Sequence, residues 1–176
     1  NGVLTLNADG GFTYLSAADY NGPDSFTYRA RDSGNLFSSP VTVNLTVSPS
    51  NDAPAAAADI FGTDPGVTLN VPVSQSILLN DTDIDGDTLT AQIISQPSSG
   101  SLSLFANGSF NYIPAAAGTF SFTYTAFDGT AASIPVTVTI VVNGQPVATN
   151  DSYTINEDGV LAVPGAGILA NDTDPE

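Results

Sequence analysis

Apolar and polar side chains alternate with a period of two along several short stretches of this 176-residue chain. The pattern is clearest in Ser101–Leu104, Ser109–Tyr112, Phe120–Ala126 and Val136–Val142, where Ser, Thr or Asn separates the apolar residues. Successive side chains of a β-strand point to opposite faces, so this pattern predicts strands with one face in a core. The period is two rather than 3.6, which favours an all-β fold.

Turn-forming residues separate these stretches at intervals of about 8 to 12 residues, as expected of an antiparallel sandwich. Asn107-Gly108 and Asp9-Gly10 each lie between alternating segments and predict hairpins. We therefore predict seven-stranded, immunoglobulin-like antiparallel β-sandwich modules. The predicted strands of the one whole module are 56–61, 67–73, 88–95, 101–105, 109–113, 119–127 and 134–142.

The chain also repeats itself. Gly2–Tyr14 matches Gly100–Tyr112 at 7 of 13 positions, and Ile77–Asp83 recurs as Ile168–Asp174. The period of 91 to 98 residues is close to the ~100 residues of one β-sandwich. The prediction is that residues 1–50 are the C-terminal half of one repeat, 51–142 a complete repeat, and 143–176 the N-terminal part of a third with its first two strands. We accordingly expect the chain to be a piece of a longer polypeptide.

Charge narrows the range of functions. Eighteen acidic residues face two cations, Arg29 and Arg31, which gives a formal charge of −16. Such a chain cannot neutralise a run of phosphates, and anionic membranes repel it, so neither nucleic acid nor a membrane is an expected partner. Cys and His are absent, which excludes disulfides, the usual zinc sites and Ser-His-Asp or Cys-His catalysis. No signal peptide or membrane-spanning run is visible.

Four carboxylates gather between the second and third predicted strands, at Asp81, Asp83, Asp85 and Asp87. At this spacing they repel one another, so the loop either stays mobile and solvated or binds a cation. Oxygen ligands on a flexible loop suit Ca²⁺ better than Mg²⁺, which requires stricter octahedral geometry. An EF-hand is rejected because position 12 of such a loop is Gln92, where a bidentate Glu is needed.

Strand order predicts which acidic residues share one end of the module. The chain enters the sandwich at the end that also carries the loops after the second and sixth strands. The predicted ligands of this site, at the junction with the preceding repeat, are Asn51, Asp52, Asp59, Asp81, Asp83, Asp85, Asp87 and Asp128. The third repeat keeps Asp151, Asp172 and Asp174, but its linker begins Asn143-Gly144, so we expect weaker calcium binding at the second junction.

As a combination, these motifs resemble the bacterial cadherin-like, immunoglobulin-like tandem repeats of large surface adhesins and secreted repeats-in-toxin proteins. The resemblance is carried by Asn51–Pro54, Ile77–Asp87, Gly100–Leu104, Asn107–Tyr112 and Ser121–Tyr124, and it covers essentially the whole chain. It implies β-sandwiches in a row, calcium at or near their junctions, and export to the bacterial cell surface. It also implies roles in spacing or adhesion, with neighbouring repeats of the same chain as the first partners.

Two further functions compete with a calcium-stabilised extender. One is recognition of a carbohydrate or protein ligand on a host or bacterial surface, with Tyr20 or Phe105 as an exposed aromatic contact. Paired Asp side chains could in principle serve as the acid and base of a glycosidase. They occur in a repeated loop without a pocket-forming insertion, so we predict that the chain is not an enzyme.

Overall fold

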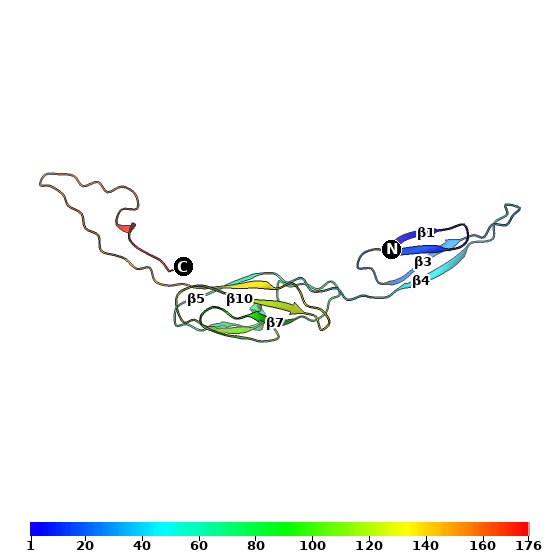
Figure 1. The fold of residues 1–176 in the computed structure, drawn as a ribbon, viewed down its shortest axis with the longest axis horizontal. Coiled ribbons are helices and arrows are strands. Elements are labelled where there is room, and N and C mark those ends of the chain that lie inside the picture. Colours follow the sequence, from blue (N-terminus) through cyan, green and yellow to red (C-terminus); the bar gives the residue numbers. More distant parts are fainter. Residues whose placement is uncertain (176) are drawn as a thin grey trace. The chain divides into compact units, whose positions relative to one another are not determined.

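The computed structural model describes residues 1–175, and internal contacts divide the chain into two compact units. The first, Asn1–Asp52, is called unit 1 below, and the second begins at Ala53. Each unit is built from short strands (Figure 1). The strands of unit 1 are β1 (Gly2–Leu6), β2 (Phe12–Ser16), β3 (Gly22–Tyr28) and β4 (Val41–Val47). Those of the second unit are β5 (Asp59–Thr63), β6 (Leu69–Val71), β7 (Thr90–Ser95), β8 (Ser101–Leu104), β9 (Phe110–Ile113), β10 (Gly118–Phe127) and β11 (Val136–Val142).

The seven strands β5 to β11 form a β-sandwich, here called the complete module. One sheet has the order β5-β11-β10-β7 and the other β6-β9-β8. All seven predicted strands are present, and the predicted all-β sandwich class is confirmed. The pairing of β5 with β11 is parallel, whereas the other strand pairings described for the module are antiparallel. The next strand, β6, lies in the other sheet, so β5 does not form a hairpin with it. The neighbour of β5 is instead β11, which runs in the same direction.

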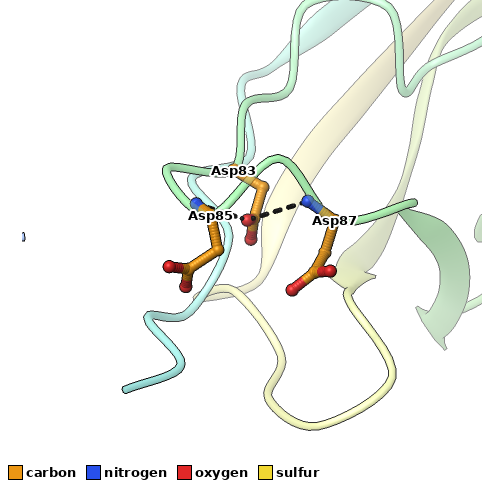
Figure 2. A group of neighbouring side chains, drawn as sticks. All are labelled: Asp83, Asp85 and Asp87. Carbon is orange, nitrogen blue, oxygen red and sulfur yellow. Dashed lines mark hydrogen bonds between the residues drawn. The ribbon is translucent and has the colours of Figure 1, made fainter. Parts of the chain in front are cut away.

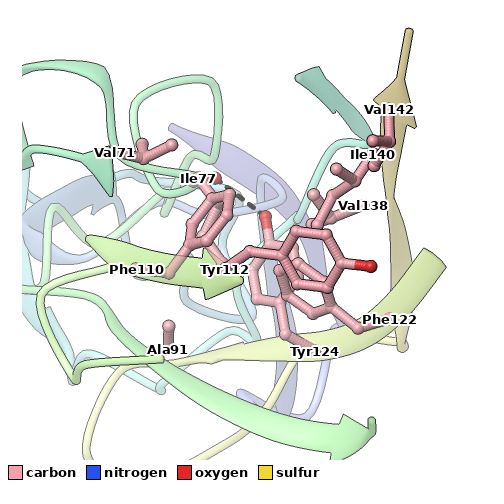
Figure 3. Packing of buried hydrophobic residues seen from close by; sticks show 10 residues of the cluster. All are labelled: Val71, Ile77, Ala91, Phe110, Tyr112, Phe122, Tyr124, Val138, Ile140 and Val142. Atoms are coloured by element: carbon pink, nitrogen blue, oxygen red, sulfur yellow. Dashed lines mark hydrogen bonds between the residues drawn. The ribbon is translucent and has the colours of Figure 1, made fainter. Parts of the chain in front are cut away.

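The core of the complete module lies between these sheets and contains the apolar residues that alternate along the strands (Figure 3). Phe110 of β9 and Phe122 of β10 meet edge to face with ring centroids 5.5 Å apart, and Phe61 of β5 contacts Phe110 in the same way. This is the geometry that aromatic quadrupoles prefer. The fully buried members also include Tyr112, Tyr124, Ile77, Val138, Ile140 and Val142.

Most predicted strand boundaries differ from the structure by one to three residues, and two of these shifts have a clear local cause. The first strand begins at Asp59 instead of residue 56, because the backbone before it pairs with a loop. The second strand ends at Val71 instead of residue 73, where Pro72 follows and a 3-10 turn spans Val73–Gln75. Proline has no N–H for a sheet ladder and commonly ends a strand. The Asn107-Gly108 hairpin is present, and Gly108 has the positive φ of 77° that favours glycine.

Unit 1 repeats half of the complete module. In β1–β2 the pair Leu6–Phe12 corresponds to Leu104–Phe110 of β8–β9. In β3–β4 the pair Phe26–Val43 has the register of Phe122–Val138 in β10–β11. The described part of unit 1 contains these four strands only, without counterparts of β5, β6 and β7.

Residues 143–175 contain no strand, although the sequence predicts two there. Their described elements are an isolated bridge between Val147 and Thr173 and a 3-10 turn at Gly167–Leu169. The physical reason is the lack of a partner. A strand is stabilised by its cross-strand neighbours and by burial of one face. Residues 143–175 have neither a neighbouring strand nor a buried face.

Candidate metal centre

A short clasp joins the start of the complete module to the acidic loop. Ala55 and Thr82 form a two-way backbone bridge, with N–O distances of 2.8 and 3.0 Å. Two residues on, the backbone N–H of Ala57 donates to Oδ1 of Asp81 at 2.8 Å. The predicted proximity of the chain's entry into the sandwich and the loop after β6 is therefore present.

Asp59, the first residue of β5, lies within this clasp. The Nδ2 group of Asn80 donates to its Oδ1 at 3.1 Å, while Oδ2 is buried without a hydrogen-bond partner. Burial, together with the nearby charge of Asp81, raises the pKa of Asp59 from 3.8 to about 6. A buried carboxylate oxygen with no donor is costly, so the site favours either a proton or a cation at Asp59.

Tyr124 of β10 brings a hydroxyl to the same place. This hydroxyl lies 2.8 Å from the carbonyl of Ile77, 3.3 Å from that of Ala57, and 3.0 and 3.1 Å from the carboxylate oxygens of Asp81. A phenol has one proton for these four acceptors. Burial first, and then the charge of Asp81, raises the Tyr124 pKa, so the hydroxyl stays a neutral donor. This end of the complete module, where the chain enters the sandwich, is called the pole below. It has more hydrogen-bond acceptors than donors.

Burial also raises the pKa of Asp81, and it outweighs the hydrogen bonds from Ala57 and Tyr124 that act in the opposite direction. Burial thus makes the charged forms of the neighbouring carboxylates Asp59 and Asp81 less favourable, and a bound cation would offset that cost. The alternation that placed Tyr124 in the core was correct. The sequence analysis did not predict the hydrogen bond from Tyr124 to Asp81. The available signal was the pattern Phe122-x-Tyr124, in which the second inward-facing residue, nearer the pole, carries a hydroxyl.

The rest of the acidic loop forms a second cluster (Figure 2). One carboxylate oxygen each of Asp83, Asp85 and Asp87 lies within 4.8 Å of the others. The backbone N–H groups of Asp85 and Asp87 donate to Oδ1 of Asp83 at 3.0 and 3.3 Å, which curls the loop around that carboxylate. Gly86 allows the turn with a positive φ of 80°. Oδ2 of Asp83, like that of Asp59, is buried without a hydrogen-bond partner.

The donor set matches a hard divalent cation. It consists of carboxylate oxygens on a loop, with no nitrogen or sulfur ligand, and a chain without His or Cys can supply nothing softer. Ca²⁺ accepts six to eight oxygens in flexible geometry, whereas Mg²⁺ demands a near-ideal octahedron. The two buried, unpartnered carboxylate oxygens fit such an ion, because its charge would offset their desolvation.

Three other predicted ligands have different surroundings. Asp128 follows β10, and its Oδ1 accepts from the backbone N–H groups of Thr130 and Ala131 at 2.6 and 2.7 Å. That carboxylate closes its own loop. Asn51 and Asp52 belong to unit 1, where Nδ2 of Asn51 donates to the carbonyl of Asp52 at 2.9 Å. For these three residues metal ligation remains a sequence-based prediction.

Residues 147–173 form the same kind of clasp. Oδ1 of Asp172 accepts from the N–H of Thr149 at 2.8 Å, as Asp81 does from Ala57. Asn171 donates to the carbonyl of Asn150 at 3.3 Å, as its counterpart in the complete module does to Ala58. Asp151 and Asp174 are exposed, and their predicted role as ligands is likewise untested by this geometry.

Two packed sheets of seven strands, a parallel first edge and an acid-rich pole at the chain's entry define a β-sandwich of the cadherin type. Residues 51–144 match the family model of the bacterial cadherin-like domain, and residues 1–48 match that of the cadherin-like domain. The first match covers more than half of the chain, which therefore belongs to the bacterial cadherin-like domain family. No protein of curated function matches it in sequence.

A solved protocadherin structure agrees on the fold. The EC3-6 cis-dimer structure of protocadherin gammaB7 has a TM-score of 0.51 at 16% identity, covering 87% of this chain and 42% of that one. Human mucin-like protocadherin EC1-2 scores 0.47 at 17% identity, covering 82% of this chain and 85% of that one. An endo-fucoidan hydrolase of glycoside hydrolase family 107 scores 0.41 at 19%, covering 84% of this chain and 24% of that one. The chain thus spans about a quarter of that hydrolase.

Family membership indicates an adhesive or structural repeat module. Cadherin-like domains are generally extracellular, typically bind calcium and are not enzymes. Within residues 1–175, no helix has the length and apolar character needed to cross a membrane.

Proposed function

We propose that the chain is a calcium-stabilised structural and adhesive module of an extracellular bacterial adhesin, where it acts as a rigid extender in cell adhesion. The observation that carries this proposal is the pair of buried, unpartnered oxygens, Oδ2 of Asp59 and Oδ2 of Asp83, beside further carboxylates in the same module. The family supports it, because cadherin-like domains typically bind calcium.

The proposed ligands fall into a core group and an outer group. The core group is Asp59, Asp81, Asp83, Asp85 and Asp87 at the pole of the complete module. Asn51, Asp52 and Asp128 are proposed as further calcium ligands, and Asp151, Asp172 and Asp174 as the ligands of a weaker equivalent in the next repeat. The proposed division into repeats is 1–50, 51–142 and 143–176, and neighbouring repeats are the proposed partners.

Calcium would act as a structural switch between compartments. Extracellular modules bind it with Kd of about 10⁻⁴ to 10⁻³ M, so a few millimolar calcium stabilises the bound state by about 1 to 2 kcal/mol per site. Cytosolic calcium is too dilute to fill such a site. The module would therefore be loose inside the cell and stiff outside it, as an extender on a cell surface requires.

The test is a thermal melt of the chain with and without a few millimolar calcium. At roughly 4–8 °C per kcal/mol for a domain of this size, the midpoint should rise by several degrees. Asp83→Asn should remove most of the rise. Asp64→Asn is the matched control, because Asp64 is an exposed carboxylate in the loop between β5 and β6, at the opposite end. An equal midpoint with and without calcium would refute the proposal.

A further inference from the structure

The first and last strands of the complete module are direct neighbours in one sheet. Asp59 of β5 lies opposite Val138 of β11, and Thr63 lies opposite Val142. The chain enters the module before β5 and leaves it after β11. A pull along the chain therefore passes from β5 directly to β11, and strands β6 to β10 lie outside this path.

The two strands run in the same direction, which decides how such a pull acts on them. Tension enters at Asp59 and leaves at Val142, and in a parallel pair these residues lie at opposite ends of the ladder. The pull therefore slides β5 along β11 instead of peeling the two strands apart. The bonds of a parallel ladder are evenly spaced along the strands, so they share this load and must break together.

Both ends of the ladder are reinforced where the load enters and leaves. At the entry, the two-way backbone bridge between Ala55 and Thr82 holds the chain just before β5. At the exit, the N–H of Asn143 donates to the carbonyl of Thr63 at 2.8 Å, just beyond the end of β11. Strands fray from their ends, so these bonds oppose the first step of opening.

Side chains add to the resistance against sliding. Phe61 of β5 packs edge to face on Phe110 of the other sheet with ring centroids 5.1 Å apart, whereas the adjacent Ile60 is 76% exposed. A slip of one residue moves every side chain of a strand to the opposite face. Such a slip would turn Phe61 out of the core and Ile60 into it, so even the smallest displacement disrupts the packing.

We propose that the β5–β11 ladder is a load-bearing shear clamp, which gives the complete module a further function: it transmits tension along the chain without unfolding. This inference rests on the proposed function as an extender, because tension reaches a module only through the chain on either side of it. It does not rest on calcium, since the ladder joins the backbones of β5 and β11 alone. The resistance of the module should then depend on the direction of the pull.

The sequence contains no Cys, so a pair of introduced cysteines can serve as attachment points for the pull. Ala53→Cys with Gln145→Cys loads the ladder in shear, because these exposed positions lie before β5 and after β11. Ala53→Cys with Ile134→Cys peels the ladder from one end, because Ile134 lies just before β11 and both attachment points are then beside the start of β5. Ile134 is 79% exposed, so this pair is also placed outside the core.

Each double variant is stretched as a single molecule, within the 176-residue chain, in an optical or magnetic trap. At equal loading rates, we expect the unfolding force to be several-fold higher for the 53–145 pair than for the 53–134 pair. Forced unfolding is governed by the unfolding barrier and not by the equilibrium stability. The thermal midpoints of the two variants should therefore agree although their unfolding forces differ.

Equal forces in the two directions, or a higher force for the 53–134 pair, would overturn the proposal. The measurement is repeated in a calcium chelator, where the difference between the two directions should persist. A difference present only with calcium would assign the resistance to the acidic loop, which overturns the clamp and leaves the proposed calcium site intact. A directional difference in a chain whose melting does not respond to calcium would support the clamp and refute the calcium site.

Discussion

Residues 55–83 and 147–174 have similar sequences and form the same backbone bridge. In both, an Asp carboxylate accepts a hydrogen bond from a backbone N–H, and an Asn side chain donates one to a backbone carbonyl. They differ in burial. The first stretch supplies β5, β6 and core residues, whereas the second has no strand and exposes its apolar side chains. The clasp is therefore encoded by residues close to it, while the strands depend on partners elsewhere in the sandwich.

The largest effect should come from the paired isoleucines. Ile77→Ala removes fully buried atoms and should cost about 2–5 kcal/mol of unfolding free energy. Ile168→Ala, at an exposed counterpart, should cost less than about 0.5 kcal/mol in dilute protein. Urea unfolding followed by tyrosine fluorescence measures both. Equal losses would mean that residues 147–174 are packed like residues 55–83.

The paired tyrosines give a smaller contrast. Tyr124→Phe deletes the hydroxyl that holds Asp81 and should cost about 1–3 kcal/mol, since buried acceptors lose their donor. Tyr28→Phe should change the stability of dilute protein by less than about 0.5 kcal/mol. The same urea assay compares them, and a neutral Tyr124→Phe would show that the hydroxyl is dispensable.

Acid pH separates the buried carboxylates of the pole from ordinary ones. The folded-state pKa of Asp59 is about 6 against an ordinary 3.8, so the folded chain binds the proton more tightly. Calcium-free stability should then fall as pH rises from about 4 to about 6 and level off above.

Asp59→Asn should flatten this fall and raise calcium-free stability at pH 7, while it weakens the calcium response. Melts from pH 4 to pH 7.5 in chelator provide the measurement, with Asp64→Asn as the control. A wild-type stability that instead rises across this range would contradict the assigned burial of Asp59.

The smallest effects should come from the asparagines of the clasp. Asn80→Ala removes the hydrogen bonds to the Ala58 carbonyl and to Oδ1 of Asp59, whereas Asn171→Ala removes the bond to the Asn150 carbonyl, and each bond is worth about 0.5–1.5 kcal/mol. Hydrogen exchange of the Thr82 and Thr173 amides, each bonded at 3.0 Å across its bridge, reads the local opening. Faster exchange at Thr82 alone would mean that the second clasp does not form in solution.

The strands of the sandwich were predictable because their alternation is local and the repeat supplied a second copy of the pattern. The parallel β5–β11 edge was not predicted, because the relative direction of two paired strands depends on which strand becomes the neighbour, and the alternation does not encode this. The absence of strands in residues 143–175 was also not predicted. Similarity to the complete module shows that a segment has the sequence pattern of a strand, but it does not show that the pairing strands are present.

The acidic loop was predictable from the spacing of its four carboxylates, three of which cluster in the structure. The binding of Asp81 by Tyr124 was not, since these residues are 43 positions apart and a core tyrosine looks the same in sequence whether or not its hydroxyl has a partner. Orphaned oxygens, such as Oδ2 of Asp59, depend on side-chain packing that no local pattern encodes.

The acidic pole of the complete module is proposed to bind calcium, and residues 171–174 are proposed to bind it more weakly. Hydrogen exchange of the 176-residue chain, with and without millimolar calcium, tests it at the level of single loops. We predict strong protection of residues 81–87 and weaker protection of residues 171–174. Equal protection of the two loops, or none in residues 81–87, would contradict the account.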